Sequence, residues 1–281
     1  MVTESAGTKR EAAAVVATAM AQGLGSLDEW QAKTLLADYG IAVPEGGLAH
    51  SEDEAVAIAR RLDGPVVVKA IGSHISHKTE HGLVALNLFG DEAVRTAARS
   101  LLALTKGQDA VLLVERMVRG AREFMIGMKR DPLFGPVIVF GIGGIFAEAH
   151  KDITLGVTPL EDRDIEGMLA GIRASALLDE FRGLPPVDRA SLARAIRALA
   201  LIAEDHPAVT EIDVNPLIIE GATPVAADAL VILGPAAASG ASAHIRRVTS
   251  TPDLTPLFAP RSVTVVGASS DTSKWGGSLL R

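Results

Sequence analysis

The sequence contains no cysteine among its 281 residues. Disulfide bonds, thiolate catalysis and cysteine metal sites are therefore excluded, and the composition is compatible with a reducing compartment. Long hydrophobic runs are also missing, because the alanine- and valine-rich stretch from Ala12 to Ala21 is too short to span a bilayer and lacks the layout of a signal peptide. We therefore predict a cytoplasmic protein that does not insert into membranes.

The chain also lacks the excess positive charge that attracts polyanions. It has 27 Lys and Arg residues against 34 Asp and Glu residues, which gives a formal net charge of -7 at pH 7. Such a chain exerts no general attraction on nucleic acid or anionic lipid, so a bound phosphate group would need individually placed cations. We predict no nucleic-acid partner.

The order of helical and strand patterns predicts an α/β (α+β) protein with mixed and antiparallel sheets. Residues 234–256 are rich in Gly, Ala, Ser, Thr and Pro, which is typical of a linker. The strand and helix start expected after this linker are too short to bury a core of their own. The predicted segments are an N-terminal helix in 1–25, a first lobe in 26–109, a second lobe in 110–233, the linker, and the truncated start of another domain in 257–281.

Local patterns predict several elements within the two lobes. Ser26 with Glu29 has the spacing of a capping box and predicts the start of a helix. The segment Ile41–Pro44 is interpreted as a short edge strand. The apolar segments Val209–Val214 and Val225–Leu233 are interpreted as two strands that can form a hairpin, with Asp228 in the middle of the second.

The stretch from Pro65 to Val84 is the most suggestive of chemistry. It is interpreted as a buried strand that carries Lys69, a polar loop with His74, His77 and His81, and a second strand. Lys69 can be a phosphate ligand or a lysine that extends its ammonium group to water at a strand end. The three histidines can bind zinc, lie unused on the surface, or include one nucleophilic imidazole that carries a phosphoryl group.

Two further patterns suggest ligand sites. Gly141, Gly143 and Gly144 follow a strand predicted over Pro136–Phe140, where they can let the backbone approach a phosphate or can form an ordinary turn. Asp213 and Asn215 alternate with apolar residues, and Asp228 lies within an apolar run. Oxygen ligands on two adjacent strands suit Mg²⁺, although the same alternation occurs on a half-exposed strand.

From about Leu27 to Leu233, the chain resembles the ATP-grasp domain of ADP-forming acyl-CoA synthetases, relatives of succinyl-CoA synthetase. The tail from Leu257 to Leu280 is similar to the opening of their Rossmann-like CoA-binding domain. The resemblance implies a two-lobed ATP-grasp fold. The motifs that carry it are Tyr39–Pro44, Pro65–Lys69, His77–Glu80, Arg130–Pro136, Phe140–Phe146 and Asp213–Pro216.

The resemblance also implies residue roles. His77 matches a histidine on a swinging loop that carries the phosphoryl group, and Lys69 matches the lysine on the nucleotide phosphates. Glu115 falls at the hinge near adenine, and Glu123 at the position expected to touch the ribose. The expected Mg²⁺ ligands are Asn215 and Asp228, with Asp213 close by, and the glycines at 141, 143 and 144 are expected to line the nucleotide site.

The implied reaction converts acid, CoA and ATP into acyl-CoA, ADP and phosphate through a phosphohistidine relay. The implied cofactors are ATP or ADP and Mg²⁺, with CoA bound only by the missing domain. The expected partners are the CoA-binding and ligase domains of a parent chain or partner subunit, and the chain can also form a homo-oligomer. On its own it is expected to bind nucleotide without making acyl-CoA.

The sequence departs from the family pattern at several places, and two alternatives stay open beside the implied reaction. Glu80 replaces an aspartate, Arg116 an acidic residue, and Gly156 and Leu230 stand where arginine is common. The first alternative is a carboxylate ligase that forms an acyl phosphate without phosphohistidine. The second is a regulatory nucleotide-binding protein whose catalysis has decayed.

Overall fold

The computed structural model of the chain describes residues 9–72, 82–106, 110–144, 152–235 and 258–262. The chain divides into two compact units, Met1–Ala238 and Ser239–Arg281, and only residues 258–262 are described in the second. The domain start predicted over 257–281 thus lies almost entirely outside the described residues. Within these ranges, no helix is both long enough and apolar enough to cross a membrane.

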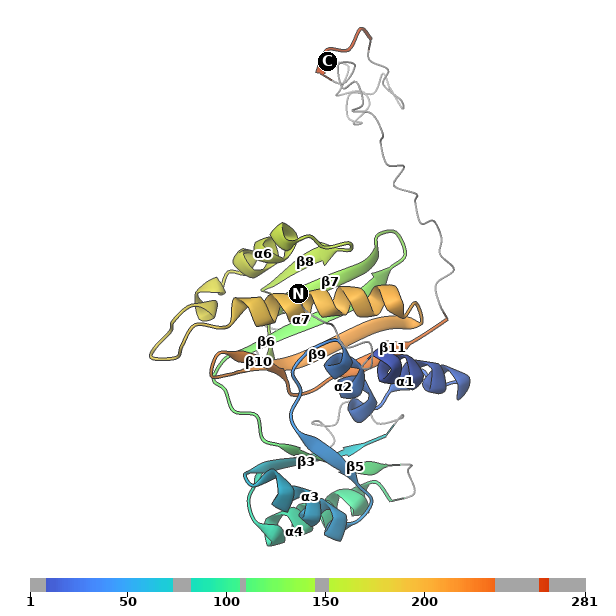
Figure 1. The fold of residues 1–281 in the computed structure, drawn as a ribbon, viewed down its shortest axis with the longest axis vertical. Coiled ribbons are helices and arrows are strands. Elements are labelled where there is room, and N and C mark those ends of the chain that lie inside the picture. Colours follow the sequence, from blue (N-terminus) through green and yellow to red (C-terminus); the bar gives the residue numbers. More distant parts are fainter. Residues whose placement is uncertain (1–8, 73–81, 107–109, 145–151, 236–257, 263–281) are drawn as a thin grey trace, which may run out of the picture. The chain divides into compact units, whose positions relative to one another are not determined.

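The larger of two sheets in the first unit has seven strands within the described part of the chain (Figure 1). Its order is β1-β11-β9-β6-β7-β8, with β10 paired to β9, and these pairings are antiparallel. Short turns join β6 to β7 and β9 to β10, and such turns favour antiparallel pairing. The strands are β1 (Ser26–Leu27), β6 (Glu123–Asp131), β7 (Gly135–Ile142), β8 (Ile153–Val157), β9 (Val209–Glu220), β10 (Thr223–Ala226) and β11 (Leu230–Leu233).

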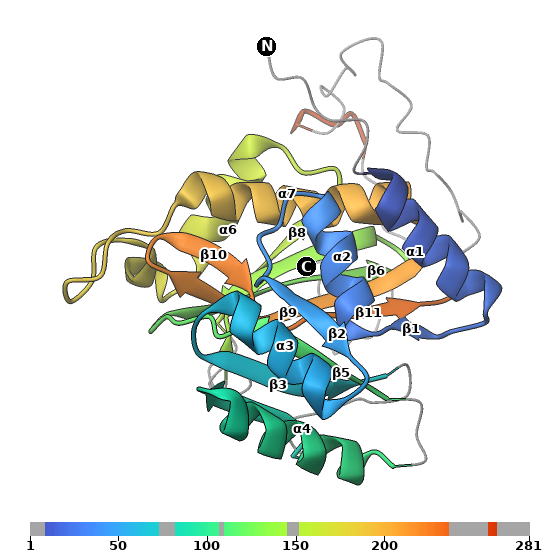
Figure 2. The ribbon, with the colours of Figure 1, turned by 60° about the horizontal axis from the view of Figure 1, so that its bottom comes forward.

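Helices cover one face of the larger sheet. The longest, α7 (Arg189–Asp205), contacts β6 and β7 and buries Leu192, Ile196 and Leu199 fully, which is the apolar stripe expected from their spacing. Two N-terminal helices pack against each other beside β1 and β11 (Figure 2). The remaining elements of this half are α1 (Lys9–Ala21), α2 (Glu29–Asp38), α6 (Asp162–Gly171) and the 3₁₀ helix η2 (Ser175–Leu178).

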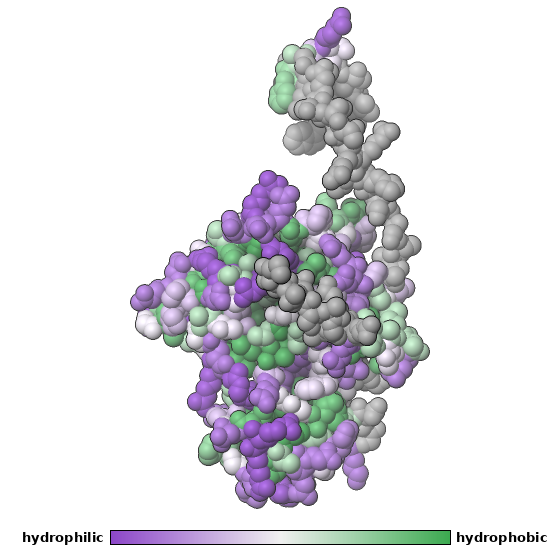
Figure 3. Space-filling model, in the orientation of Figure 1, coloured by the Kyte–Doolittle hydropathy of each residue, from purple (hydrophilic) through white to green (hydrophobic). Residues whose placement is uncertain are grey.

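The smaller sheet has its own apolar core and the order β2-β5-β3-β4. Its strands are β2 (Gly46–Ala49), β3 (Val66–Ile71), β4 (Val84–Leu88) and β5 (Val111–Arg116), and its helices are α3 (Glu52–Leu62) and α4 (Asp91–Leu104). Hydrophilic residues gather over these two helices in Figure 3. They include the exposed ion pairs Arg60 with Asp91, Arg95 with Asp53, and Arg99 with Glu52.

The strand pairing corrects the division of the two lobes that the sequence suggested. Strand β5 was expected to open the second lobe, but it pairs with β2 and β3 in the smaller sheet. Conversely, β1 pairs with β11, and α2 contacts β11, so residues 26–38 belong with the larger sheet. Pairing between distant segments decides membership here, and local sequence patterns carry no information about it.

Three local predictions also change. Helix α2 begins after Asp28, which forms the capping box with Gln31, whereas Ser26 lies in β1. Ile41–Pro44 is not a strand, because the N–H of Ile41 donates to the carbonyl of Leu36 and closes the end of α2. The predicted strand Val225–Leu233 divides into β10 and β11, and Asp228 lies between them.

Candidate functional site

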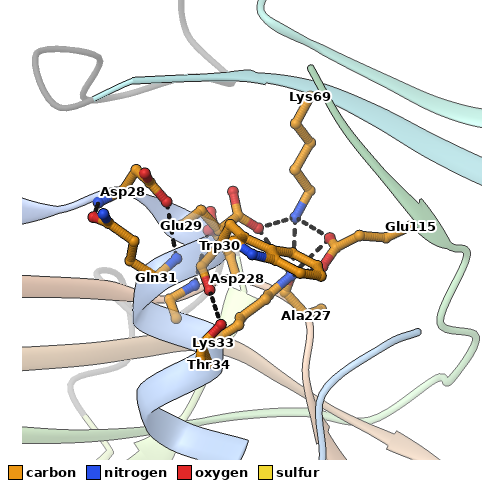
Figure 4. A network of polar contacts seen from close by, with 11 residues as sticks. Asp28, Glu29, Trp30, Gln31, Lys33, Thr34, Lys69, Glu115, Ala227 and Asp228 are labelled. Atoms are coloured by element: carbon orange, nitrogen blue, oxygen red, sulfur yellow. Dashed lines mark hydrogen bonds and ion pairs between the residues drawn. The ribbon is translucent and has the colours of Figure 1, made fainter. Parts of the chain in front are cut away.

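Lys69 lies where the two sheets meet, in a cluster of four buried charged side chains (Figure 4). It comes from β3 and faces Glu115 of β5 in the smaller sheet. Helix α2 supplies Glu29 and Lys33 from the other half, one helical turn apart. The four side chains are only 1% to 7% exposed, so the cluster is removed from water.

Direct hydrogen bonds and ion pairs hold the cluster together. Lys69 Nζ contacts Glu29 Oε1, donates to the carbonyl of Ala227 at 2.8 Å, and lies 3.3 Å from Glu115 Oε2. Lys33 Nζ lies 2.7 Å from each carboxylate oxygen of Glu115, 2.9 Å from Glu29 Oε1 and 2.9 Å from the same Ala227 carbonyl. Two carboxylates thus compensate two ammonium groups, as buried charges require.

The two lysines differ in their electrostatic surroundings. Burial works against the charged form of Lys69, but Glu29, Glu115 and Asp228 outweigh it and hold the pKa of Lys69 above its usual value. Burial and the neighbouring Lys69 instead lower the pKa of Lys33, against the opposing effect of the two glutamates. Lys69 is therefore a fixed positive charge at the junction of the two halves.

Glu115 was expected near an adenine ring, and the structure places its side chain in the charge cluster. Its backbone pairs with Gly46 on one side and Val67 on the other, and its carboxylate accepts from Lys33. The position lies near the end of β5, before the chain crosses to the larger sheet. A contact with adenine remains a prediction.

The acidic residues predicted as metal ligands converge at the same junction. Asp213 and Asn215 are half-buried on one face of β9, while Ile212 and Val214 on the other face belong to the core, as the alternation predicted. Burial raises the pKa of Asp213 to about 6, and the negative charges of Asp228 and Glu211 add to the effect. Asp228 follows Ala227, whose carbonyl accepts from Lys69.

These oxygen donors fit Mg²⁺ chemically. The site offers two carboxylates that repel each other and a nearby amide oxygen, and Mg²⁺ prefers hard oxygen ligands of this type. Water and phosphate oxygens usually complete the coordination shell of Mg²⁺. Gly144 N–H donates to Asn215 Oδ1 at 3.0 Å, which fixes the orientation of the amide. The described residues contain no group of three or more His, Cys, Asp or Glu side chains that could hold a metal. A cation here would depend on these three residues and on ligand oxygens.

The predicted glycines have a structural reason to be glycine. A Cβ on Gly143 would lie 2.1 Å from the carbonyl oxygen of Phe124, and one on Gly141 would lie 2.5 Å from that of Asp152. A Cβ on Gly144 would lie 2.0 Å from Glu123 Oε2, at the residue expected near the ribose. The glycines therefore let neighbouring backbone and Glu123 approach closely, and phosphate binding by their N–H groups stays a prediction.

His77 lies outside the described residues, as do His74, His81 and Glu80. The ends of the surrounding segments are described. Lys69 and Ile71 lie in β3, and Val84 opens β4 and pairs with Lys69. The described residues on either side of 73–81 thus lead into two paired strands, one of which supplies Lys69.

The crossover between the sheets contains two arginines that sequence reasoning did not assign. Arg116 Nη1 and Nη2 donate to the two carboxylate oxygens of Glu220 at 2.8 and 2.9 Å, which ties the end of β5 to the end of β9. Arg122 is buried and donates to the backbone carbonyls of four residues, Leu177, Asp179, Pro185 and Gly221. Arg116 thus has a structural role at a position where the family pattern has an acid.

Comparison with known protein families decides the classification. Residues 18–233 match the ATP-grasp domain family, which covers most of the chain. The chain belongs to the ATP-grasp family. The resemblance inferred from its motifs and the predicted two-lobed α+β fold are thereby confirmed.

Relatives of this ATP-grasp chain are acid-CoA ligases. It is 38% identical over 212 residues to the β subunit of acetate-CoA ligase (ADP-forming) I of Pyrococcus furiosus, covering 74% of this chain and 91% of that subunit. It is 36% identical over 200 residues to 4-hydroxybutyrate-CoA ligase (ADP-forming) of Nitrosopumilus maritimus, covering 69% of this chain but only 28% of that protein. The predicted kinship with ADP-forming acyl-CoA synthetases is therefore confirmed.

Solved structures agree with this ATP-grasp assignment. Dinucleotide-forming acetyl-coenzyme A synthetase 1 of Ca. Korarchaeum cryptofilum, in complex with coenzyme A and Ca-AMPCP, superimposes with a TM-score of 0.75 and 35% identity over 79% of this chain and 99% of that one. A second structure of that enzyme, with Mg-AMPPCP, has a phosphohistidine segment pointing towards its nucleotide-binding site, and the TM-score is 0.71 at 34% identity over 79% of this chain and 100% of that one.

Two other departures from the ATP-grasp family pattern also have structural consequences. A Cβ on Gly156 would lie 2.7 Å from both Leu160 Cδ2 and Met168 Sδ, so a larger side chain there would require these two flexible side chains to move. Leu230 pairs with Asp213 across β11 and β9, and it brings no positive charge to that carboxylate. The raised pKa of Asp213 is consistent with this neutral neighbour.

Sequence reasoning missed Glu29 and Lys33. Glu29 was expected only as part of a capping box, Lys33 was not singled out, and nothing in the sequence shows that the helix faces Lys69 from the other half. The structure buries both charges on the same side of α2 as Ala32, Leu35 and Leu36.

Proposed function

We propose that this chain is the nucleotide-binding part of an ADP-forming acyl-CoA synthetase, which interconverts acid, CoA and ATP with acyl-CoA, ADP and phosphate. One observation carries the proposal. Lys69 donates to the carbonyl of Ala227, and the next residue, Asp228, forms an acidic pair with Asp213. Of the four clustered charges, Lys69 is the only one predicted to contact phosphate, and it therefore lies next to this acidic pair. A cation and an acidic metal site side by side suit a nucleotide with its Mg²⁺.

Each residue has a separate role in this proposal. Lys69 donates to phosphate oxygens, and its raised pKa keeps it charged at any physiological pH. Asp213, Asn215 and Asp228 hold Mg²⁺, which supplies neutralisation of phosphate charge when bound. Glu123 binds the ribose from the start of β6, beside Gly144, and Glu115 marks the strand end near adenine.

His77 carries the phosphoryl group in this proposal. A nitrogen of the neutral His77 imidazole attacks the γ-phosphorus of ATP, the bond from that phosphorus to the bridging oxygen breaks, ADP leaves, and the ring releases its N–H proton. In the reverse direction a β-phosphate oxygen of ADP attacks the phosphorus, the phosphorus–nitrogen bond breaks, and the ring takes up a proton, which yields ATP and neutral imidazole. The histidine needs a loop that moves between two sites. The acid and CoA bind on domains of a longer parent chain or partner subunit, as the greater length of the second relative suggests. A cytoplasmic location belongs to the same proposal.

Phosphorylation of His77 tests the proposal. The 281-residue chain is incubated with Mg²⁺ and ATP labelled at the γ-phosphate, and acid-labile, base-stable label on the protein is measured. We expect label on the wild type and its loss in His77→Ala, whereas His81→Ala, a matched change four residues further along the sequence, keeps it. Absence of label on the wild type, or label that persists in His77→Ala, would contradict the relay and favour a direct carboxylate ligase or a nucleotide sensor.

A further inference from the structure

The ammonium group of Lys69 is already surrounded by three protein oxygens. An ammonium group offers three donors. Lys69 Nζ donates hydrogen bonds to Glu29 Oε1 and to the carbonyl of Ala227 at 2.8 Å, and it forms an ion pair with Glu115 Oε2 at 3.3 Å. A phosphate oxygen that binds Lys69 must therefore compete with these oxygens for the ammonium group.

Glu29 is the acceptor that competes most directly with a phosphate. Its contact with Lys69 is a charge-assisted hydrogen bond of the same type that a phosphate oxygen would form. Glu115 forms only an ion pair with Lys69, at 3.3 Å, and is already bound through both oxygens by Lys33. Glu29 is therefore the carboxylate whose hydrogen bond a phosphate oxygen would replace.

Lys33 allows Glu29 to release Lys69 without being left as an unpaired buried charge. Lys33 Nζ lies 2.9 Å from Glu29 Oε1 and also donates to the Ala227 carbonyl at 2.9 Å. Each of the three oxygens that contact Lys69 belongs to a group that also contacts Lys33, so each group would keep a positive partner if Lys69 moved away. Such a second partner matters because a buried carboxylate without compensation is strongly unfavourable.

The position of Glu29 is fixed by the opposite half of the protein. Helix α2 packs against α1 and β11 beside the larger sheet, whereas Lys69 belongs to β3 of the smaller sheet. The capping box of Asp28 and Gln31 holds the first turn of α2, in which Glu29 is the first residue. The carboxylate of Glu29 is thus presented to Lys69 by a rigid element.

We propose that Glu29 is a built-in anionic competitor of nucleotide phosphates for Lys69, and that Lys33 retains the Glu29 carboxylate when a phosphate takes its place. This inference rests on the proposed function of Lys69 as a ligand of a nucleoside diphosphate or triphosphate. In this proposal Glu29 acts through Lys69, and its negative charge weakens the binding of phosphate. Weaker binding favours the release of nucleotide that a reversible synthetase needs in each cycle.

Substitution Glu29→Gln tests the competition. Glutamine keeps the shape and one carbonyl oxygen for Lys69 but removes the negative charge. Calorimetric titration of the 281-residue chain with ADP and Mg²⁺ should give about fivefold to tenfold tighter binding in the variant, while the affinity for adenosine, which has no phosphate, stays unchanged. Glu52→Gln makes the same change in net charge at an exposed pair with Arg99 and should leave both affinities unchanged.

The outcomes separate this inference from the proposed function. If the wild type does not bind ADP, or if Lys69→Met binds it as well as the wild type, the role of Lys69 fails and the inference fails with it. If ADP binds through Lys69 but Glu29→Gln binds it equally or more weakly, the inference alone is wrong. Should Glu29→Gln not fold, as judged by thermal unfolding, Glu29→Asp withdraws the carboxylate by one methylene. It should then tighten ADP binding by a smaller factor, and unchanged or weaker binding overturns the inference.

Discussion

The carboxyl group of Asp213 holds its proton to a higher pH than an ordinary aspartate because of its surroundings. It is half-buried on β9, and the charges of Asp228 and Glu211 lie near it. Its pKa of about 6 in the folded chain exceeds the usual value of 3.8. The folded state therefore binds more protons than the unfolded state between these two values, and the contribution of Asp213 to stability falls as the pH rises through 6.

Substitution Asp213→Asn should therefore stabilise the chain in the absence of Mg²⁺ at pH 7. The substitution removes a charge that the fold disfavours, and we expect Tm to rise by about 2–4 °C, as for roughly 1 kcal/mol in a chain of a few hundred residues. At pH 4, where Asp213 is mostly protonated in the folded chain, the difference should shrink. Thermal unfolding at both pH values measures this. If Asp213→Asn and the wild type differ in Tm by the same amount at pH 4 and pH 7, or if the variant has the lower Tm at pH 7, the burial and repulsion described here are contradicted.

At the scale of single residues, some residues of the candidate site could be predicted from the sequence, but the contacts between them could not. Lys69, Asp213, Asn215 and Asp228 could be singled out because polar groups in apolar strands are uncommon and because they match family motifs. Glu29 could not, since its partner is 40 residues away in the sequence and belongs to the other sheet. A charge on a helix face is ordinarily solvated, and only packing between elements reveals that this one is buried.

At the scale of elements, the segment from Phe140 to Gly144 depends on close contact between backbones. Gly143 N–H donates to the carbonyl of Glu123, and a Cβ at Gly143 would collide with backbone atoms of Phe124 and Met125. No flexible side chain can move aside to relieve this contact. The glycine at 143 is therefore required for the approach of this segment to the start of β6.

Substitution Gly143→Ala should destabilise the chain by about 2 kcal/mol or more, because overpacking against backbone forces the strands apart. Gly167→Ala is the matched control, since a Cβ there meets nothing within 4 Å and Gly167 lies within α6. The control should stabilise the chain by about 0.5–1 kcal/mol through helix propensity. Urea unfolding of both variants measures the two effects. Equal stability of the two variants would contradict the close approach.

Helices and strands could be predicted where the hydrophobic periodicity is strong. Predictions failed where pairing between distant segments decides which sheet a strand belongs to. The stripe of α7 followed from Leu192, Ile196 and Leu199, and the alternation of β9 from Ile212 to Val214. The segment Ile41–Pro44, which follows α2, was mistaken for a strand, because the apolar Ile41 and Val43 satisfy a strand pattern equally well. Membership of β5 in the smaller sheet depends on its pairing with β3, to which local sequence is blind.

At the scale of the whole first unit, two sheets with separate cores meet at a few specific contacts. The buried charges around Lys69 form one connection, and Arg116 with Glu220 forms another at the crossover. The candidate phosphate ligand and the candidate metal ligands come from different sheets and reach the same Ala227–Asp228 turn. Nucleotide binding is accordingly a property of the two halves together, and neither sheet alone contains the candidate site.

Titration of the 281-residue chain with Mg-ADP, for the wild type and for Lys69→Met, tests this account most directly. Methionine keeps most of the buried length of the side chain but removes the charge and the donors. We predict that the wild type binds Mg-ADP with a measurable heat and that Lys69→Met, if folded by circular dichroism, binds at least about tenfold more weakly, as for the loss of one charge-assisted contact. A wild type that does not bind Mg-ADP, or a folded Lys69→Met variant that binds it equally well, would contradict the account.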